Sequence, residues 1–145
     1  MIGFHGRAID KGAEPPYLRY KVNGQSTSDL LLGENWVDFD EPLLVAEGPF
    51  DLARALQVYQ NSVSTMSAGF TNAVLKKIGR ATEVWTLFDE DDAGKIARAK
   101  VESLAGKKRI VRHLSPGGWH DAGATPAKVL ADLVWRFLPK GEFIS

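Results

Sequence analysis

The chain has 145 residues, the length of one domain, and its composition of 44% hydrophobic and 25% charged residues is typical of a globular protein. It contains no cysteine, which excludes disulfide scaffolds, zinc ribbons and thiol catalysis. Basic and acidic residues balance at 18 each, a net charge of zero, whereas a freestanding nucleic-acid-binding protein is normally more basic.

Residues 1–40 predict a short β-rich N-terminal extension. Ile2–Ile9 and Tyr17–Val22 are rich in strand-forming residues, and Asp10–Pro16 between them contains a glycine and two prolines. We therefore expect a hairpin with a long loop, followed by a polar loop over 23–29.

Residues 41–140 predict an α/β domain. The expected strands are Leu43–Ala46, Ser62–Met66, Glu83–Phe88 and Lys108–Leu114, and the expected helices are Phe50–Gln60, a segment capped by Thr71, Ala93–Ala105 and a segment starting at Thr125-Pro126. This alternation of strand and helix predicts a Rossmann-like, parallel four-stranded sheet flanked by helices.

Helical periodicity predicts which side chains of the last two helices face the core. For the third helix the spacing selects Ala93, Ile96, Ala97, Lys100, Val101, Leu104 and Ala105, and for the fourth it selects Leu130, Leu133, Val134 and Phe137. Trp85 and Trp135 also fit core positions.

The sequence gives no sign of a membrane or secretory protein. No apolar run approaches the about 18 residues of a membrane span, and the N-terminus lacks the layout of a signal peptide. The three histidines are too scattered to predict a metal cage. We expect a cytoplasmic protein without a membrane partner.

Charge is distributed unevenly along the neutral chain. Residues 83–92 contain five acids and no base, whereas residues 95–112 contain seven bases and a single acid, Glu102. A solvated helix face explains such a pattern in most proteins. The alternative is that Lys95 and Arg98 contact the backbone of a DNA template.

Acidic residues follow three of the predicted parallel strands. Glu47 follows the first, Asp89, Glu90 and Asp91 follow the third, and Asp121 lies in the loop after the fourth. Since ligands of open α/β sheets bind at the carboxyl ends of the strands, we expect these carboxylates to share one rim.

Two readings of this acidic rim remain open. An Asp before a helix is usually an N-cap, worth ~1 kcal/mol, and Asp91 or Asp92 can be only that. However, three carboxylates within ~4 Å of one another would cost on the order of 10 kcal/mol in repulsion. Such a cluster must protonate, spread apart or bind a cation, and carboxylate oxygens favour Mg²⁺ or Mn²⁺.

Two acidic motifs resemble those of the Toprim domain. Leu43–Asp51, Leu-Leu-Val-Ala-Glu-Gly-Pro-Phe-Asp, resembles its strand–Glu-Gly–helix motif, and Phe88–Gly94 resembles its Asp-x-Asp-x-Ala-Gly motif. Ser64–Gly69 resembles the intervening loop, and Leu114–Asp121 resembles the final Pro-x-Gly-x-x-Asp segment. The resemblance spans about Leu43 to Leu138 and implies a Toprim-like fold.

The beginning of the chain is similar to the small subdomain that precedes the Toprim core in bacterial and phage DNA primases. Ile2–Arg7 resembles its Ile-Gly-Phe-Gly-Gly-Arg strand, and Pro16-Tyr17-Leu18 its Lys-Tyr-Leu. The resemblance implies a Mg²⁺- or Mn²⁺-dependent nucleotidyltransferase that makes RNA primers from ribonucleoside triphosphates on single-stranded DNA.

The resemblance also implies roles for individual residues. Asp89 and Asp91 would hold metal, Glu47 would be a ligand or general base, and Asp121 would complete the site. Arg7, Arg19 and Lys21 would meet nucleotide phosphates. Independently, the backbone amides of Ser67 and Gly69, at an expected helix start, could receive a phosphate.

Three positions depart from the primase pattern. Pro16 stands where a lysine is expected, residues 26–31 contain no base, and Gly123 stands where a second aspartate is expected. No template-reading zinc domain or helicase motor is present, so we expect an excised domain or a protein that works with such partners. The alternatives are a Toprim-type metal-dependent nuclease and a non-catalytic module that binds nucleotides or single strands.

Overall fold

The computed structural model describes residues 3–7, 12, 14, 17–21, 26–106 and 109–139. Its elements are β1 (Gly3–Arg7), β2 (Tyr17–Lys21), the 3-10 turn η1 (Thr27–Asp29), β3 (Leu43–Ala46), α1 (Pro49–Ala55), β4 (Ser62–Ser64), α2 (Asn72–Ile78), β5 (Glu83–Leu87), α3 (Asp92–Glu102), β6 (Ile110–His113) and α4 (Ala127–Val134). Ile2, most of the expected turn 10–16, Val22 and Lys108 lie outside the described residues.

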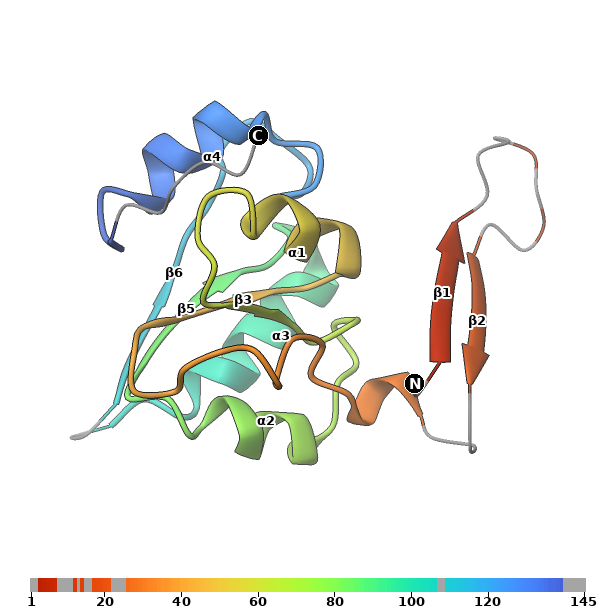
Figure 1. Cartoon of the computed structure of the whole chain (residues 1–145), viewed down its shortest axis with the longest axis horizontal. Helices are drawn as coiled ribbons and strands as arrows, with labels where there is room; N and C mark the ends of the chain where they lie inside the picture. Colours follow the sequence, from red (N-terminus) through yellow and green to blue (C-terminus); the bar gives the residue numbers. More distant parts are fainter. Residues whose placement is uncertain are drawn as a thin grey trace.

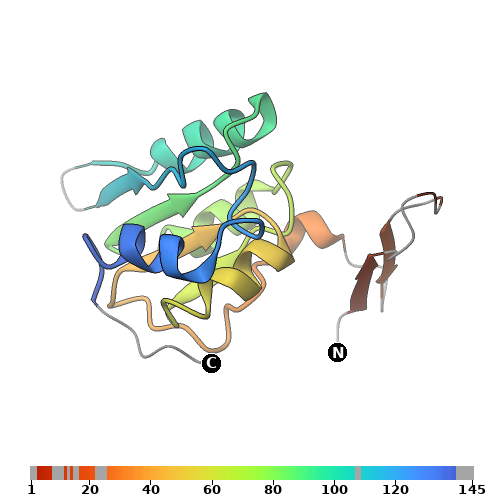
Figure 2. The ribbon, with the colours of Figure 1, turned by 90° about the horizontal axis from the view of Figure 1, so that it is seen from above.

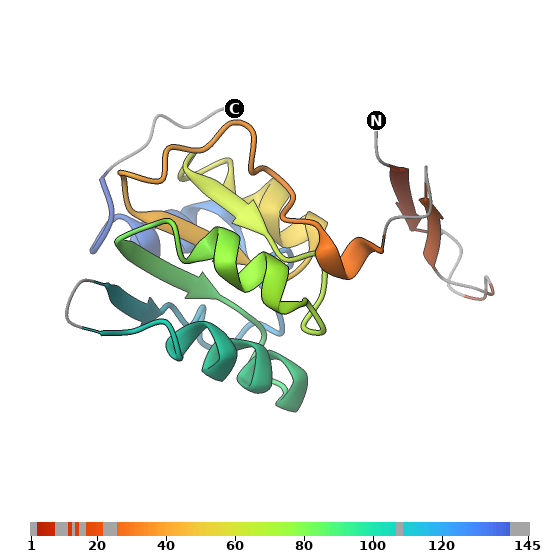
Figure 3. The ribbon, with the colours of Figure 1, turned by 90° about the horizontal axis from the view of Figure 1, so that it is seen from below.

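The central feature is a parallel sheet with strand order β4-β3-β5-β6. Helices α1 and α4 cover one face and α2 and α3 cover the other, as the views in Figures 1, 2 and 3 show. The predicted α/β fold class is therefore confirmed. Strands β1 and β2 form a separate antiparallel pair, which agrees with the expected hairpin.

Strand β3 is apolar throughout because both of its faces are covered by helices. Leu43 and Val45 join the core beneath α2 and α3, whereas Leu44 joins the core beneath α1 and α4. All four residues of β3 are inaccessible to solvent. This burial holds β3, and with it the carboxyl edge of the sheet, in a fixed place.

Helix α3 buries a narrower stripe than its periodicity predicted. Its buried residues are Gly94, Ala97 and Val101, whereas Ile96 is 70% exposed. The helix lies over β6, the edge strand of the sheet, so one flank of its apolar stripe has nothing to cover. Lys100, the polar member of the predicted face, donates to the Phe70 carbonyl and lies 4.7 Å from the centre of the Phe70 ring.

Other local expectations were corrected as well. Helix α1 ends at Ala55 rather than at residue 60. Thr71 occupies the N-cap position of α2, but its hydroxyl caps no amide and is buried without a partner in the described part of the chain. Phe137, expected inside, is 53% exposed and stacks on buried Trp85, with ring centres 5.2 Å apart. Within the described ranges, no helix is long and apolar enough to cross a bilayer.

Candidate metal centre

Glu47 lies at the carboxyl end of β3, where the chain turns into α1. Its carboxylate is partly buried, and its Oε2 has no hydrogen-bond partner in the described structure. Burial raises the pKa of Glu47, the Asp89 backbone amide lowers it, and the charges of Asp91 and Asp51 raise it further. The Glu47 carbonyl accepts hydrogen bonds from Ser64 Oγ at 2.9 Å and Thr65 Oγ1 at 3.3 Å, so the end of β4 fixes its backbone.

Asp89 lies at the carboxyl end of the neighbouring strand β5, next to Glu47. Burial raises its pKa to about 7, with further contributions from the charges of Glu47, Asp51, Asp121 and Asp91, in that order. The carboxylates of Glu47, Asp51, Asp121 and Asp91 are thus near enough to Asp89 for their charges to act on it. That Glu47, Asp89, Asp91 and Asp121 together form a metal site stays a prediction.

Asp91 is the N-cap of α3. Its Oδ1 accepts a hydrogen bond from the Gly94 amide at 2.7 Å, which satisfies one of the free donors at the helix start. Asp92, which follows, is exposed and pairs loosely with Lys95 at 3.7 Å. Asp91 is therefore an N-cap, as one of the two interpretations of the acidic rim predicted for Asp91 or Asp92. Its second carboxylate oxygen remains available to an ion.

Gly94 allows the loop of Asp89 to lie against the first turn of α3. A Cβ at this position would overlap the Asp89 carbonyl oxygen, far inside contact distance. The glycine of the Asp-x-Asp-x-Ala-Gly pattern is thus a packing requirement that places Asp89.

Asp51 is a member of the site to which the sequence analysis gave no role. It is buried, and its carboxylate accepts the Gly48 amide at 2.9 Å and the Gly123 amide at 2.8 Å. Burial raises the pKa of Asp51, the two hydrogen bonds lower it, and the charge of Asp121 raises it again, so that the net shift is upward. The signal was available, because an acid three residues after an N-cap glycine fits a capping box.

Asp121 is held by its own loop and by Asp51. Its Oδ1 accepts the Ala124 amide at 2.5 Å, while the Asp51–Gly123 hydrogen bond ties the loop to α1. A Cβ at Gly123 would lie 3.1 Å from Asp51 Oδ1 and 3.3 Å from Asp121 Oδ1. The glycine that replaces the expected second aspartate therefore leaves Asp51 room to hold the loop.

The acidic rim fits a divalent cation in its chemistry. Its donors are carboxylate oxygens, which suit Mg²⁺ and Mn²⁺, and one of them, Glu47 Oε2, is buried without a partner among the described residues. Within the described ranges, no three acidic or histidine side chains converge into a ready-made cage.

The remaining predicted positions lie elsewhere. Ser67 and Gly69 lie in the loop between β4 and α2, and α2 begins only at Asn72, so their amides are not in its first turn. Arg7, Arg19 and Lys21 lie on the hairpin, paired with Tyr17, His5 and Gly3 respectively, so the register places these three basic positions on one face.

The basic stretch that follows the acids is largely occupied. Arg98 pairs with Glu102 at 3.2 Å, within α3. Arg109 donates to the carbonyls of Ala81 at 3.0 Å and Leu104 at 3.1 Å, and also to that of Gly79. The guanidinium of Arg109 therefore joins the ends of α2 and α3 to the sheet, and less of this charge faces outward than the sequence suggested.

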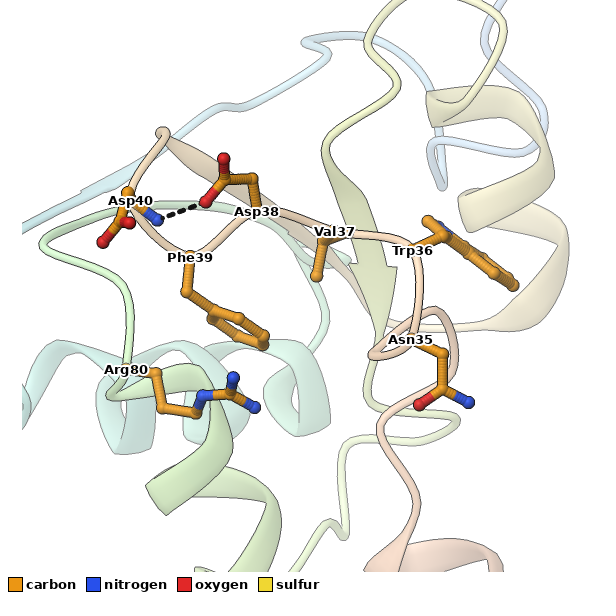
Figure 4. A pocket seen from close by; sticks show the side chains of 7 residues that line it. All are labelled: Asn35, Trp36, Val37, Asp38, Phe39, Asp40 and Arg80. Carbon is orange, nitrogen blue, oxygen red and sulfur yellow. Dashed lines mark hydrogen bonds between the residues drawn. The ribbon is translucent and has the colours of Figure 1, made fainter.

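A concavity of about 640 Å³ lies at the opposite edge of the sheet from the acids. Residues 35–40 and Arg80 line it, and the Arg80 guanidinium lies 3.8 Å from the centre of the Phe39 ring. Figure 4 shows that Trp36 points away from Phe39 and Arg80, so the lining does not converge on one point. We therefore assign the candidate site to the acidic rim.

Comparison with known proteins identifies the family of the chain. A family model described as Toprim-like matches residues 44–122, which span both acidic motifs and reach the residue after Asp121. A search of curated protein sequences found no match.

Solved primase structures share the fold. A DNA primase domain from Pseudomonas aeruginosa is 20% identical over 97% of this chain and 44% of its own, with a TM-score of 0.67. The Aquifex aeolicus primase, with its zinc-binding and RNA polymerase domains, is 22% identical over 97% of this chain and 37% of its own, with a TM-score of 0.68. A DnaG primase catalytic domain bound to single-stranded DNA is 23% identical over 94% of this chain and 44% of its own, with a TM-score of 0.61. The chain thus spans less than half the length of these structures.

Proposed function

The chain belongs to the Toprim-like family, and we propose that it is the catalytic core of a DNA primase that transfers nucleotides to start RNA primers on single-stranded DNA. The observation that supports this proposal is the position of Glu47 and Asp89 after the neighbouring strands β3 and β5, with Asp121 in the loop after β6 and near enough for its charge to act on Asp89. The shared fold of the primase structures supports the same choice.

Mg²⁺ or Mn²⁺ bound at this rim would polarise the α-phosphate, ease deprotonation of the attacking hydroxyl and stabilise the leaving pyrophosphate. Asp89 and Asp91 would hold the ion, and Asp121 would complete its shell. Glu47 is the ligand or general base, since its partner-free Oε2 is available for either task. Asp51 fixes the Asp121 loop through Gly123.

We assign nucleotide and template contacts to basic positions and to backbone amides outside the rim. We assign Arg7, Arg19 and Lys21 to nucleotide phosphates because the hairpin register places them on one face. Ser67 and Gly69 offer backbone amides beside the end of β4, and Lys95 and Arg98 are the candidates for the template backbone. We propose a zinc-binding template reader and a replicative helicase as partners. The similar Aquifex aeolicus primase carries a zinc-binding domain, and another similar structure is the primase fragment of the bacteriophage T7 primase-helicase protein.

Metal-linked stability tests the site. Millimolar Mg²⁺ or Mn²⁺ should raise the melting temperature by mass action on the native state. The double change Asp89→Asn, Asp91→Asn should abolish that rise and leave the metal-free protein at least as stable, because asparagine at position 91 still caps α3. The matched control is Asp132→Asn with Glu102→Gln, which removes two exposed acids outside the rim.

Glu47→Gln tests the chemistry. The variant should keep its fold, yet lose primer synthesis by ~10²–10⁴ in an assay that supplies the flanking primase domains, ribonucleotides and Mn²⁺. Wild-type rates in the folded variant would contradict the assigned role of Glu47. Metal-dependent nicking of DNA without nucleotides would favour the nuclease, and nucleotide or single-strand binding that needs neither metal nor Glu47 would favour the non-catalytic module.

A further inference from the structure

Glu90 and His113 connect the acidic loop, residues 88–91, to the edge strand of the sheet. His113 Nε2 lies 3.3 Å from Glu90 Oε1, and His113 Nδ1 lies 3.0 Å from Thr86 Oγ1. Thr86 is fully buried and stands opposite His113 in the β5–β6 register. An unbroken chain of contacts therefore runs from the interior of the sheet to the loop.

The position of Glu90 within this loop makes the contact consequential. Glu90 lies between Asp89 and Asp91. The charge of Asp91 raises the pKa values of both Glu47 and Asp89, so the two residues that flank Glu90 belong to the acidic rim. Glu90 is instead held by His113 and by a hydrogen bond with Ser115. Because Glu90 is the chain neighbour of both residues, a tether on its side chain restrains the backbone that carries Asp89 and Asp91.

A role in stability alone explains the pair poorly. The Glu90 side chain is 46% exposed, and exposed ion pairs contribute about 0–1 kcal/mol to folding. His113, in contrast, is only 12% exposed in its side chain and is held by Thr86. The sheet thus fixes His113 through Thr86. Glu90, at the exposed end of this series of contacts, belongs to the segment that carries two of the assigned ligands.

We propose that His113 is a positioning residue which, through Glu90, holds Asp89 and Asp91 in the orientation that receives a divalent cation. This inference rests on the proposed function, because it takes those two carboxylates as metal ligands. It assigns a use to a histidine to which the sequence analysis gave none. Removing an outer-shell group that orients a metal ligand typically weakens metal affinity by about 10–100-fold.

Mn²⁺ affinity, measured by electron paramagnetic resonance at one fixed pH, tests the proposal. His113→Phe and Glu90→Ala should each weaken Mn²⁺ binding by ~10-fold. The double variant should be no weaker than either single variant, because both remove the same contact. His113→Gln should restore much of the affinity, since its amide can donate to Glu90. Asp92→Ala is the matched control, because it removes a neighbouring charge without touching His113.

A second readout does not depend on metal. Amide hydrogen exchange over residues 88–94 of the metal-free protein should be faster in His113→Phe and Glu90→Ala than in the wild type, while exchange in β3 stays unchanged. Glu90→Ala keeps the test valid if His113→Phe does not fold, since Glu90 is exposed.

The outcomes separate this inference from the function on which it rests. If Asp89→Asn, Asp91→Asn abolishes Mn²⁺ binding but the His113 and Glu90 variants bind as the wild type does, the positioning role is overturned and the metal site stands. An equal loss in Asp92→Ala and Glu90→Ala would also overturn it, because charge alone would then explain the effect. If the wild type binds no Mn²⁺, the proposed function fails, and unchanged exchange over 88–94 would overturn the tether as well.

Discussion

Four consecutive acids follow β5, and each has a different environment. Asp89 turns into the carboxylate rim, Glu90 contacts His113, Asp91 caps α3 and Asp92 faces solvent. The pKa values separate the first two, since burial and neighbouring charges raise that of Asp89 to about 7 while hydrogen bonds lower that of Glu90. The four acids therefore have four different roles: Asp89 belongs to the rim, Glu90 connects the loop to His113, Asp91 caps α3 and Asp92 is a solvated charge.

The raised pKa of Asp89 predicts how the metal-free protein responds to pH. The native state holds the Asp89 proton more tightly than the unfolded chain, whose carboxyl titrates near 3.8. Stability from this group is therefore present at low pH and is lost as pH rises through about 7. We expect the melting temperature measured in EDTA to fall between pH 5 and 8 more steeply in the wild type than in Asp89→Asn.

Excess Mg²⁺ supplies the control for this pH experiment. An ion replaces the proton as the partner of the carboxylates, so the fall between pH 5 and 8 should flatten when Mg²⁺ is present. Parallel curves for wild type and Asp89→Asn in EDTA would show that Asp89 is not in a repulsive cluster.

At the scale of elements, the fit between the loop of Asp89 and helix α3 depends on Gly94. Gly94→Ala places a methyl group against the Asp89 carbonyl, and the backbone must shift to relieve the overlap. We expect a loss of about 1–3 kcal/mol in the free energy of unfolding, together with weaker Mn²⁺ binding. Urea denaturation and Mn²⁺ titration measure the two effects.

Gly106→Ala is the matched control for this substitution. A Cβ at Gly106 meets nothing within 4 Å, so the same chemical change should cost little stability and leave Mn²⁺ affinity unaltered. Equal losses in the two variants would mean that Gly94 contributes only its backbone freedom.

The elements themselves were largely predictable because their signals are local. Four strands and four helices follow from periodicity, and the apolar run of β3 identifies a strand covered on both faces. Helix faces were less predictable, because the periodicity of α3 does not reveal that the helix lies over an edge strand. Ile96 was therefore expected inside and is exposed.

The same distinction applies to the site. Glu47, Asp89, Asp91 and Asp121 could be predicted as one set because strand ends of a parallel sheet share one edge. The hydrogen bond between Asp51 and Gly123 joins residues 72 positions apart, and the contact between His113 and Glu90 joins residues 23 apart. Neither is implied by any local pattern, so the supports of the rim required the structure.

At the scale of the whole molecule, the neutral charge conceals how few bases are available to a template. Arg109 is bonded to three carbonyls and Lys100 to a fourth, whereas Lys95 and Arg98 hold solvent-accessible pairs with acids of their own helix. The chain also spans only 44% of the Pseudomonas aeruginosa primase domain and 37% of the Aquifex aeolicus primase. We therefore expect most template affinity, and the conditions for priming, to depend on flanking domains or a separate template-binding partner.

Single-strand binding by this chain alone should accordingly be weak and should fade as salt rises. Removing one base that neutralises a phosphate should reduce the slope of log affinity against log salt by about 0.7 for a single strand. Lys95→Gln with Arg98→Gln should lower that slope without changing Mn²⁺ affinity, because template and ion use different groups. Lys128→Gln with Arg136→Gln, an equal loss of charge at and beyond α4, should leave the slope nearly unchanged. Fluorescence anisotropy with a labelled oligonucleotide measures both pairs, and tight binding that is insensitive to salt would contradict the assignment of Lys95 and Arg98 to the template.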